Sequence, residues 1–206
     1  LNIQNGTTDF GDIPPAAHDE LRTQYGPGSP AAAAGHQQYF SYPAPTVQYL
    51  AMNHDRPLFG DDPATPGPDP SGNVKLKQAV NFAIDRTAMV ALRGAHSGTP
   101  TDQHLPVGLP GFRDEAIYPN TPNLIEARTH AGCTNPTDKA TCPPRTGILY
   151  CSNRAPAPAL CANVANQLLE VGLTMEVKES PRATQFTKAG TRGEPFSSAR
   201  MRRVVA

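Results

Sequence analysis

The chain has 206 residues, with 18 basic and 18 acidic side chains and a formal net charge of zero at pH 7. This length permits one or two domains with a sizeable core, and the neutral balance gives no general electrostatic case for nucleic acid or an anionic membrane as a partner. No apolar run approaches the roughly 20 residues of a membrane span. No signal peptide is visible, and the chain begins with Leu1 rather than Met.

The first quarter of the chain predicts one short helix followed by extended structure. Pro14-Pro15 and the sequence AAHDELRTQYG favour a helix that begins at the prolines and ends at Gly26. Residues 26–35 are small and predict a linker or loop. Residues 36–53 are rich in aromatic and β-branched side chains and favour extended segments interrupted by turns.

Residues 73–92 carry the clearest helical pattern. Asn73 is placed to cap a helix, and Asp85 is placed to cap a second, short helix. The first helix has an apolar face formed by Leu76, Ala79, Val80, Ala83 and Ile84. The second should turn Met89, Val90 and Leu92 inward. We therefore expect two consecutive helices that meet at Asp85.

Two loops, one acidic and one with histidines, carry residue types that can bind metals. Asp61, Asp62 and Asp69 lie in a Pro/Gly-rich loop, but their spacing does not fit a calcium loop. His96 and His104 lack Cys, Asp or Glu partners at a productive spacing. We interpret the two histidines as solvated loop residues and predict no metal site.

Residues 147–178 predict a strand, a helix and a second strand. Ile148 to Tyr150 begins the unit, Gly172 ends the helix, and apolar residues alternate with polar ones from Leu173 to Lys178. Such a unit implies parallel strands joined by a crossover. Ser180-Pro181 should start a further helix that runs toward Gly190. Residues 197–206, with three arginines, are expected to form a solvated basic tail.

The four cysteines favour disulfides in an oxidising compartment. Neighbouring cysteines are separated by eight, eight and nine residues, so the close pairs typical of zinc sites are missing from the sequence. We expect Cys133 to pair with Cys142 and Cys151 with Cys161, although four cysteines allow other connectivities. Each short closed loop should add roughly 2–3 kcal/mol of stability.

The sequence carries no recognisable catalytic motif. It has no Gly-x-Ser-x-Gly elbow, no His-Glu-x-x-His and no phosphate-binding Gly-rich loop. Asp85-Arg86 is better explained by helix capping plus a salt bridge than by catalysis. From the residues we therefore predict no catalytic residues and no cofactor.

One stretch resembles a known family. Tyr49 to Asn53, then Pro57-Leu58-Phe59, then KQAVNFAIDR at residues 77–86 resemble the signature of the family 5 extracellular solute-binding proteins of bacterial ABC importers. Lys77 stands where the family usually has Arg, and the loop before the helix is longer than usual. Further blocks that resemble the family lie in the family's order along the chain, at residues 5–10, 124–132, 150–153 and 165–173. The resemblance runs to about Phe196.

The resemblance implies a fold and a division into lobes. The expected fold is an incomplete α/β lobe of the periplasmic-binding-protein-like type II class, with βαβ units. Residues 1–48 would be the end of a first lobe and the crossing segment, and residues 49–196 part of a second lobe. Tyr49, Met52 and Asn53 match positions near the interlobe cleft, so the resemblance implies that they are ligand-binding or hinge residues; ordinary strand packing is the alternative for them.

The resemblance also implies a function, which is binding without catalysis by a protein that is not an enzyme. The chain would capture a solute, with peptides as the leading class, and deliver it to the permease subunits of an ABC importer. A monomer in the periplasm or outside the cell, with a lipid anchor as an option, fits this role. After residue 196 the sequence leaves the family pattern, so we expect a truncated chain with weak or absent binding. Two alternatives are a ligand-sensing domain of a regulator or receptor and a secreted, disulfide-stabilised enzyme domain. The sequence does not identify the solute.

Overall fold

A computed structural model describes residues 3, 5–9, 11, 13–42, 44–53, 58–60, 73–94, 96–190 and 199–205. The chain divides into two compact units, one formed by residues 1–44 with 93–99 and the other by residues 45–92 with 100–206. The first break lies four residues before the predicted lobe boundary at 48/49. The assignment of these units to family lobes stays a prediction.

The smaller unit is helical. A 3-10 turn at Pro15–Ala17 leads into α1 (His18–Tyr25), which ends at Gly26 as the sequence predicts. The expected loop at residues 26–35 instead contains the short helix α2 (Pro30–Ala33). Ser29 explains the difference, because its side chain accepts a hydrogen bond of 3.1 Å from the Ala32 amide and so caps the turn.

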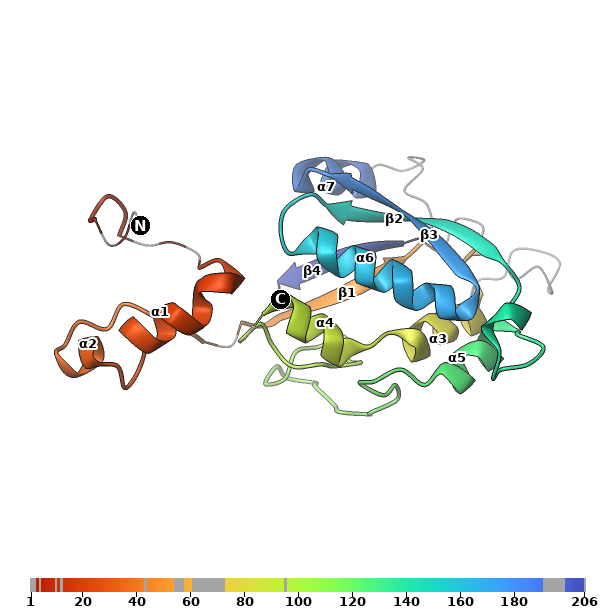
Figure 1. The fold of residues 1–206 in the computed structure, drawn as a ribbon, viewed down its shortest axis with the longest axis horizontal. Coiled ribbons are helices and arrows are strands. Elements are labelled where there is room, and N and C mark those ends of the chain that lie inside the picture. Colours follow the sequence, from red (N-terminus) through yellow and green to blue (C-terminus); the bar gives the residue numbers. More distant parts are fainter. Residues whose placement is uncertain are drawn as a thin grey trace. The chain divides into compact units, whose positions relative to one another are not determined.

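The larger unit contains a mixed four-stranded sheet (Figure 1). Its strands are β1 (Thr46–Met52), β2 (Arg145–Ser152), β3 (Leu173–Ser180) and β4 (Ala199–Val205), in the order β1-β4-β2-β3. β4 runs antiparallel to β1 and parallel to β2. The expectation of a solvated tail is therefore wrong for residues 199–205, which join the sheet between two strands distant in sequence.

The predicted strand–helix–strand unit is confirmed. β2 is followed by α6 (Ala157–Leu168), a 3-10 turn at Leu169–Val171 and β3, which pairs in parallel with β2. Gly172 ends the helical segment with φ 75°, a left-handed conformation that glycine adopts without strain. α7 (Arg182–Gly190) then follows β3, as Ser180-Pro181 predicts.

The two predicted caps also form. α3 (Val74–Ala83) begins where the Asn73 side chain accepts a hydrogen bond of 3.0 Å from the Leu76 amide. α4 (Arg86–Arg93) begins where Asp85 accepts one of 2.8 Å from the Ala88 amide. Leu92 is 44% exposed, so the expectation that it turns inward is wrong. A further helix, α5 (Leu124–Ala131), and a 3-10 turn at Lys139–Thr141 precede β2.

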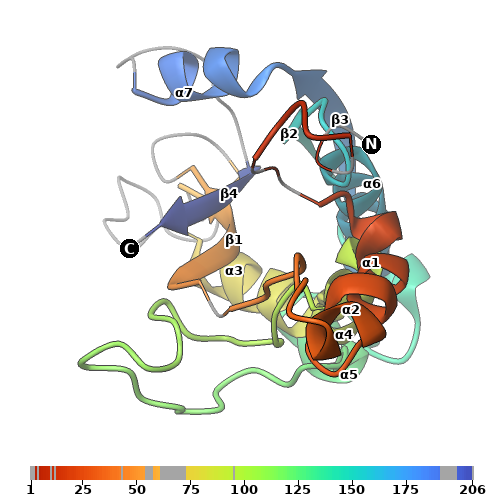
Figure 2. The same ribbon diagram turned by 90° about the vertical axis from the view of Figure 1, so that its left-hand side faces the viewer.

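One hydrophobic core fills the larger unit. The apolar face of α3 packs beside α5 and α6 (Figure 1), and one face of the sheet closes the core, with β1 next to α3 in Figure 2. Strand residues with side chains in this core alternate along β2 and β3, as a half-buried strand requires. The buried strand side chains are Leu149, Cys151, Leu173 and Met175.

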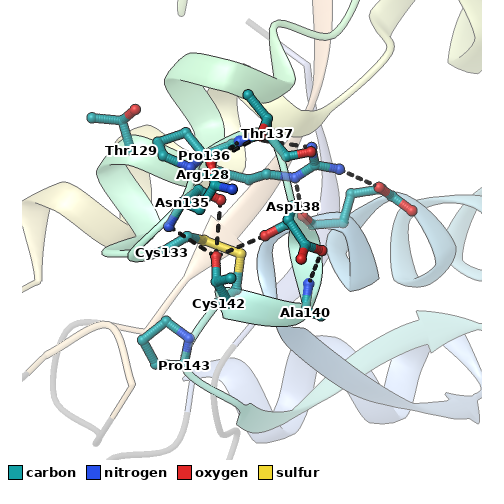
Figure 3. Close-up of a disulfide and its surroundings, with 12 residues drawn as sticks. Arg128, Thr129, Cys133, Asn135, Pro136, Thr137, Asp138, Ala140, Cys142 and Pro143 are labelled. Atoms are coloured by element: carbon teal, nitrogen blue, oxygen red, sulfur yellow. Dashed lines mark hydrogen bonds and ion pairs between the residues drawn. A yellow bond between two sulfur atoms is a disulfide. The ribbon is translucent and has the colours of Figure 1, made fainter.

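Both expected disulfides are present. Cys151–Cys161 joins β2 to α6, and Cys133–Cys142 closes the loop after α5. Figure 3 shows the Cys133–Cys142 disulfide with Arg128 beside it. The Arg128 guanidinium donates to the carbonyl oxygens of Glu170 at 2.9 Å and Pro136 at 3.3 Å, so it connects the loop to the 3-10 turn after α6. Disulfide and guanidinium together fix this loop against the core.

Glu170 completes this connection. Its carboxylate accepts from Arg128 Nη2 at 2.6 Å and from Lys139 Nζ at 2.8 Å. The hydrogen bond from Lys139 is the main reason that the pKa of Glu170 lies below its ordinary value; partial burial opposes this effect, and Arg128 adds to it. The interaction therefore stabilises the fold above the pKa of the unfolded side chain, and that stabilisation is lost as pH falls through the lowered folded pKa.

We predict that Glu170→Gln lowers the free energy of unfolding at pH 7 by roughly 1–2 kcal/mol, the scale of hydrogen bonds to charged groups that are partly solvated. The deficit should shrink as pH falls below the ordinary Glu range. Urea unfolding across a pH series measures it. Glu176→Gln is the control, because Glu176 forms a more exposed pair with Lys178 at 3.4 Å. A deficit that is constant down to pH 2.5 contradicts this explanation.

A second prediction concerns Gly172. A Cβ there would lie 2.8 Å from the Pro143 carbonyl oxygen and 2.9 Å from Cys142 Cβ, whereas Gly132, with φ 79°, has nothing within 4 Å. Alanine at either position costs roughly 1–2 kcal/mol for the left-handed backbone. Because of the clash, Gly172→Ala should cost about 1–3 kcal/mol more than Gly132→Ala. Chemical denaturation measures the free energy of unfolding of both variants. Equal losses in Gly172→Ala and Gly132→Ala would show that the protein relieves the close approach without cost.

Candidate solute-binding surface

β1 places Tyr49 and Met52, two of the three predicted ligand residues, on opposite faces. Leu50 and Met52 pack against the hydrophobic core. Because successive side chains of a strand point to opposite faces, Tyr49 lies on the other face. Asn53 follows the last residue of β1. Met52 thus has a packing contact in this structure. The ligand contacts of Tyr49, Met52 and Asn53 stay a prediction.

The strand register shows what else shares the face of Tyr49. Ala51 pairs with position 200 of β4, which pairs in turn with Tyr150 of β2. Directly paired positions present their side chains on the same face. We call this the outer face, defined by Tyr49, Ala51 and Tyr150, since it is opposite to the core. It brings two tyrosines from distant parts of the sequence onto one surface.

His104 extends the outer face into the loop after α4. Its ring centroid lies 5.4 Å from that of Tyr49, with 49° between the ring planes. The sequence predicts that His104 is a solvated loop histidine. The residue is exposed, but its ring also contacts that of Tyr49. No local sequence signal pointed to the contact, because the two rings are brought together only by the fold.

A hollow lies next to this pair of rings. Its volume is about 260 Å³ and it is open to solvent. Its lining consists of Gln103, His104, Leu105, Gly111, Arg113 and Glu115. Because small-molecule pockets usually enclose roughly 300–1,000 Å³, this hollow has room for a part of a ligand. His104 connects the hollow to Tyr49 and so to the outer face.

The loop that forms the hollow is pinned at its base by Asp102. The carboxylate accepts hydrogen bonds from the Tyr118 amide at 2.9 Å and from the Gln103 side chain at 2.7 Å. Burial acts to raise the pKa of Asp102, but the hydrogen bonds from Tyr118 and Gln103 outweigh it, so the pKa lies below its ordinary value. Asp102 therefore remains ionised and holds the two ends of the loop together at neutral pH.

Arg86 and Phe82 anchor the far end of the same loop. The Arg86 guanidinium donates to the Pro119 carbonyl at 3.1 Å and to the Asn81 carbonyl at 3.0 Å, rather than forming the expected pair with Asp85. Burial lowers the pKa of Arg86, with the charge of Asp102 acting in the opposite direction. The Phe82 and Tyr118 rings meet edge to face at 5.0 Å. The helix pair thus positions the loop.

Within the described ranges, no group of three or more His, Cys, Asp or Glu side chains could hold a metal ion; Asp61, Asp62 and Asp69 lie outside those ranges. No described helix has the length and apolar character needed to cross a membrane.

Removal of Asp102 should release the loop. We predict that Asp102→Ala raises hydrogen exchange at the Tyr118 amide by about tenfold or more, because a hydrogen bond to a charged group is worth roughly 1.5–3 kcal/mol. In the wild type the same protection should fall as pH drops through the lowered pKa of Asp102. Asp114→Ala, an exposed carboxylate of the same loop, is the control. Equal exchange in the two variants would contradict the role of Asp102.

Known structures share this fold. The substrate-binding protein CtaP of Listeria monocytogenes matches 100% of the chain at 16% identity and a TM-score of 0.71. AppA, an oligopeptide-binding protein of Bacillus subtilis solved with a nonapeptide, matches 94% at 17% identity and 0.61. NikA of Staphylococcus aureus, solved with Ni(L-His)2, matches 98% at 13% identity and 0.64. The chain spans 37 to 40% of the length of these three proteins. The α/β, periplasmic-binding-protein-like fold expected from the sequence is confirmed.

No curated protein sequence matches the chain significantly. The family model described as bacterial extracellular solute-binding proteins, family 5 Middle, matches residues 1–200, which is nearly the whole chain. The chain therefore belongs to the family 5 bacterial extracellular solute-binding proteins.

Proposed function

We propose that the chain takes part in the capture of a solute, with peptides as the leading class, for delivery to the permease subunits of an ABC importer. Family membership over residues 1–200 is the observation that carries this proposal. AppA, one of the structures with the same fold, was solved with a nonapeptide. The role is non-catalytic, and it fits a monomer located in the periplasm or outside the cell.

The outer face and the hollow are the part of this chain that we assign to the solute. Tyr49 and His104 offer adjacent ring faces, which can pack against apolar or planar groups of a ligand. Asn53 can donate and accept hydrogen bonds at the end of β1. The hollow beside them adds one positive and one negative side chain, Arg113 and Glu115. Apolar packing with a few polar groups is the usual composition of a ligand site.

Binding by this chain alone should be weak. It spans 37 to 40% of the length of the three similar structures, and the hollow is too small to enclose an oligopeptide. Much of the contact with the solute would therefore come from residues beyond these 206. We expect a dissociation constant for short peptides on the order of 1 mM, because only part of a site is engaged.

Thermal unfolding of the non-reduced chain tests this proposal. A mixture of short peptides at about 10 mM should stabilise a protein with a 1 mM dissociation constant by roughly 1.4 kcal/mol. For a chain of this size the midpoint then rises by roughly 3–5 °C. In Tyr49→Ala, the difference between the unfolding midpoints with and without peptides should be much smaller than in the wild type. Tyr42→Ala, which changes a tyrosine that is 76% exposed in the smaller unit, should leave it unchanged.

The outcomes separate the possible explanations. A rise in wild type that Tyr49→Ala removes supports solute capture at the outer face. A rise that survives Tyr49→Ala places binding elsewhere in the chain. No rise with any peptide, in a sample that unfolds cooperatively, contradicts the assignment of peptides to this surface. Submicromolar affinity contradicts the inference that most solute contacts lie outside the chain.

A further inference from the structure

The smaller unit contains a cluster of four charged or titratable side chains that solute capture does not use. His18, Asp19 and Arg22 lie on one side of α1, since residues three and four apart are neighbours on a helix. His96 comes from the segment 93–99, which belongs to the same unit. We propose that His96 is a proton-operated switch, which contacts Arg22 when it is neutral and Asp19 when it is protonated.

The neutral state follows from the chemistry of the contact with Arg22. The Arg22 Nη1 and His96 Nε2 atoms are 3.1 Å apart. A guanidinium group can only donate hydrogen bonds, so Nε2 of His96 must be the acceptor. The single proton of the neutral ring then resides on Nδ1. A hydrogen bond at this contact therefore requires the neutral Nδ1–H tautomer of His96.

Protonation removes this contact. A second proton binds at Nε2, the nitrogen that faces Arg22, and turns the acceptor into a donor. Two donors with like charges repel each other at 3.1 Å. The contact between α1 and the segment 93–99 at Arg22 is then lost.

Asp19 is placed to take over. Its Oδ1 atom lies 3.9 Å from the same Nε2, just beyond hydrogen-bond distance. A movement of about 1 Å brings the pair to the 2.7–2.9 Å of a charge-assisted bond. Protonation thus changes the partner of His96 from Arg22 to Asp19, which lies about one turn away on α1.

His18 is the remaining titratable group that faces His96. The two ring centroids are 6.5 Å apart, and His18 Nδ1 lies 3.1 Å from the hydroxyl of the buried Tyr39. A positive charge on His18 opposes the protonation of His96, as Arg22 does, while Asp19 favours it. The groups that face His96 therefore include both signs of charge.

The position of the switch in the chain gives it a consequence. Residues 93–99 connect α4 to the loop whose residues 103–115 line the hollow. Histidine is the side chain whose ordinary charge change falls between pH 5 and 8. The family is extracellular, so these proteins meet the pH of their surroundings. The switch would make the attachment of the segment 93–99 sensitive to external pH.

Nuclear magnetic resonance of the ring nitrogens tests the switch on the 206-residue chain. At pH 8.5 His96 should be the Nδ1–H tautomer. Arg22→Gln should move the midpoint of the His96 titration to higher pH, and Asp19→Asn should move it to lower pH, each by roughly 0.3 pH unit, or twofold in protonation, as for an exposed pair. Glu20→Gln, an exposed carboxylate on the same helix, is the matched control, and His36 is the internal reference.

Opposite shifts for Arg22→Gln and Asp19→Asn, both larger than for Glu20→Gln, support the exchange of partners. The Nε2–H tautomer at high pH overturns it, because that form cannot accept from Arg22. Shifts in the same direction, or shifts equal to that of Glu20→Gln, also overturn it, since they would show only the general charge of α1.

Discussion

The parallel pairing of β2 with β3 is the constraint on which the larger unit depends. Parallel neighbours need a crossover connection, and α6 supplies it by burying Leu160, Val164 and Leu168 against the sheet. The Cys151–Cys161 bond joins the end of β2 to this helix and lies in the core itself. α3 then packs beside α6, and α5 packs beside α3 and the 3-10 turn after α6, so the helical layer is built outward from one βαβ unit.

This arrangement also decides which side of the sheet is available for function. Because all the helices that build the core lie against one face, the alternation of β1 commits Leu50 and Met52 to packing. Tyr49 and Tyr150 are left on the outer face. The loop pinned by Asp102 adds His104 to that face and forms the hollow beside it. Core and candidate site are thus opposite sides of the same strands.

Sequence reasoning succeeded where the signal is local. The caps at Asn73 and Asp85 and the turn at Gly172 depend on residues within a few positions of each other, and all three form as predicted. The order of the motifs predicted the family and its fold. The pairing of the cysteines followed from an even count and the elements that they flank.

The failures have non-local causes. β4 is a strand because β1 and β2, far away in sequence, flank it, and three arginines within seven residues hide any apolar alternation. Met52 packs against the core because of strand direction, which a motif does not specify, and its ligand contact stays a prediction. The contacts of Tyr49 with His104 and of Arg22 with His96 join residues more than 50 positions apart. No pattern in the sequence marks such pairs.

In our proposal the outer face and its hollow are the solute side of the molecule. Amide chemical-shift mapping of the 206-residue chain with millimolar short peptides tests this assignment, since the method detects weak binding and locates it. We expect changes concentrated at Tyr49, Asn53 and residues 103–115, with none in the disulfide loop 133–142. Changes centred on that loop or on the smaller unit, with the outer face silent, would contradict it.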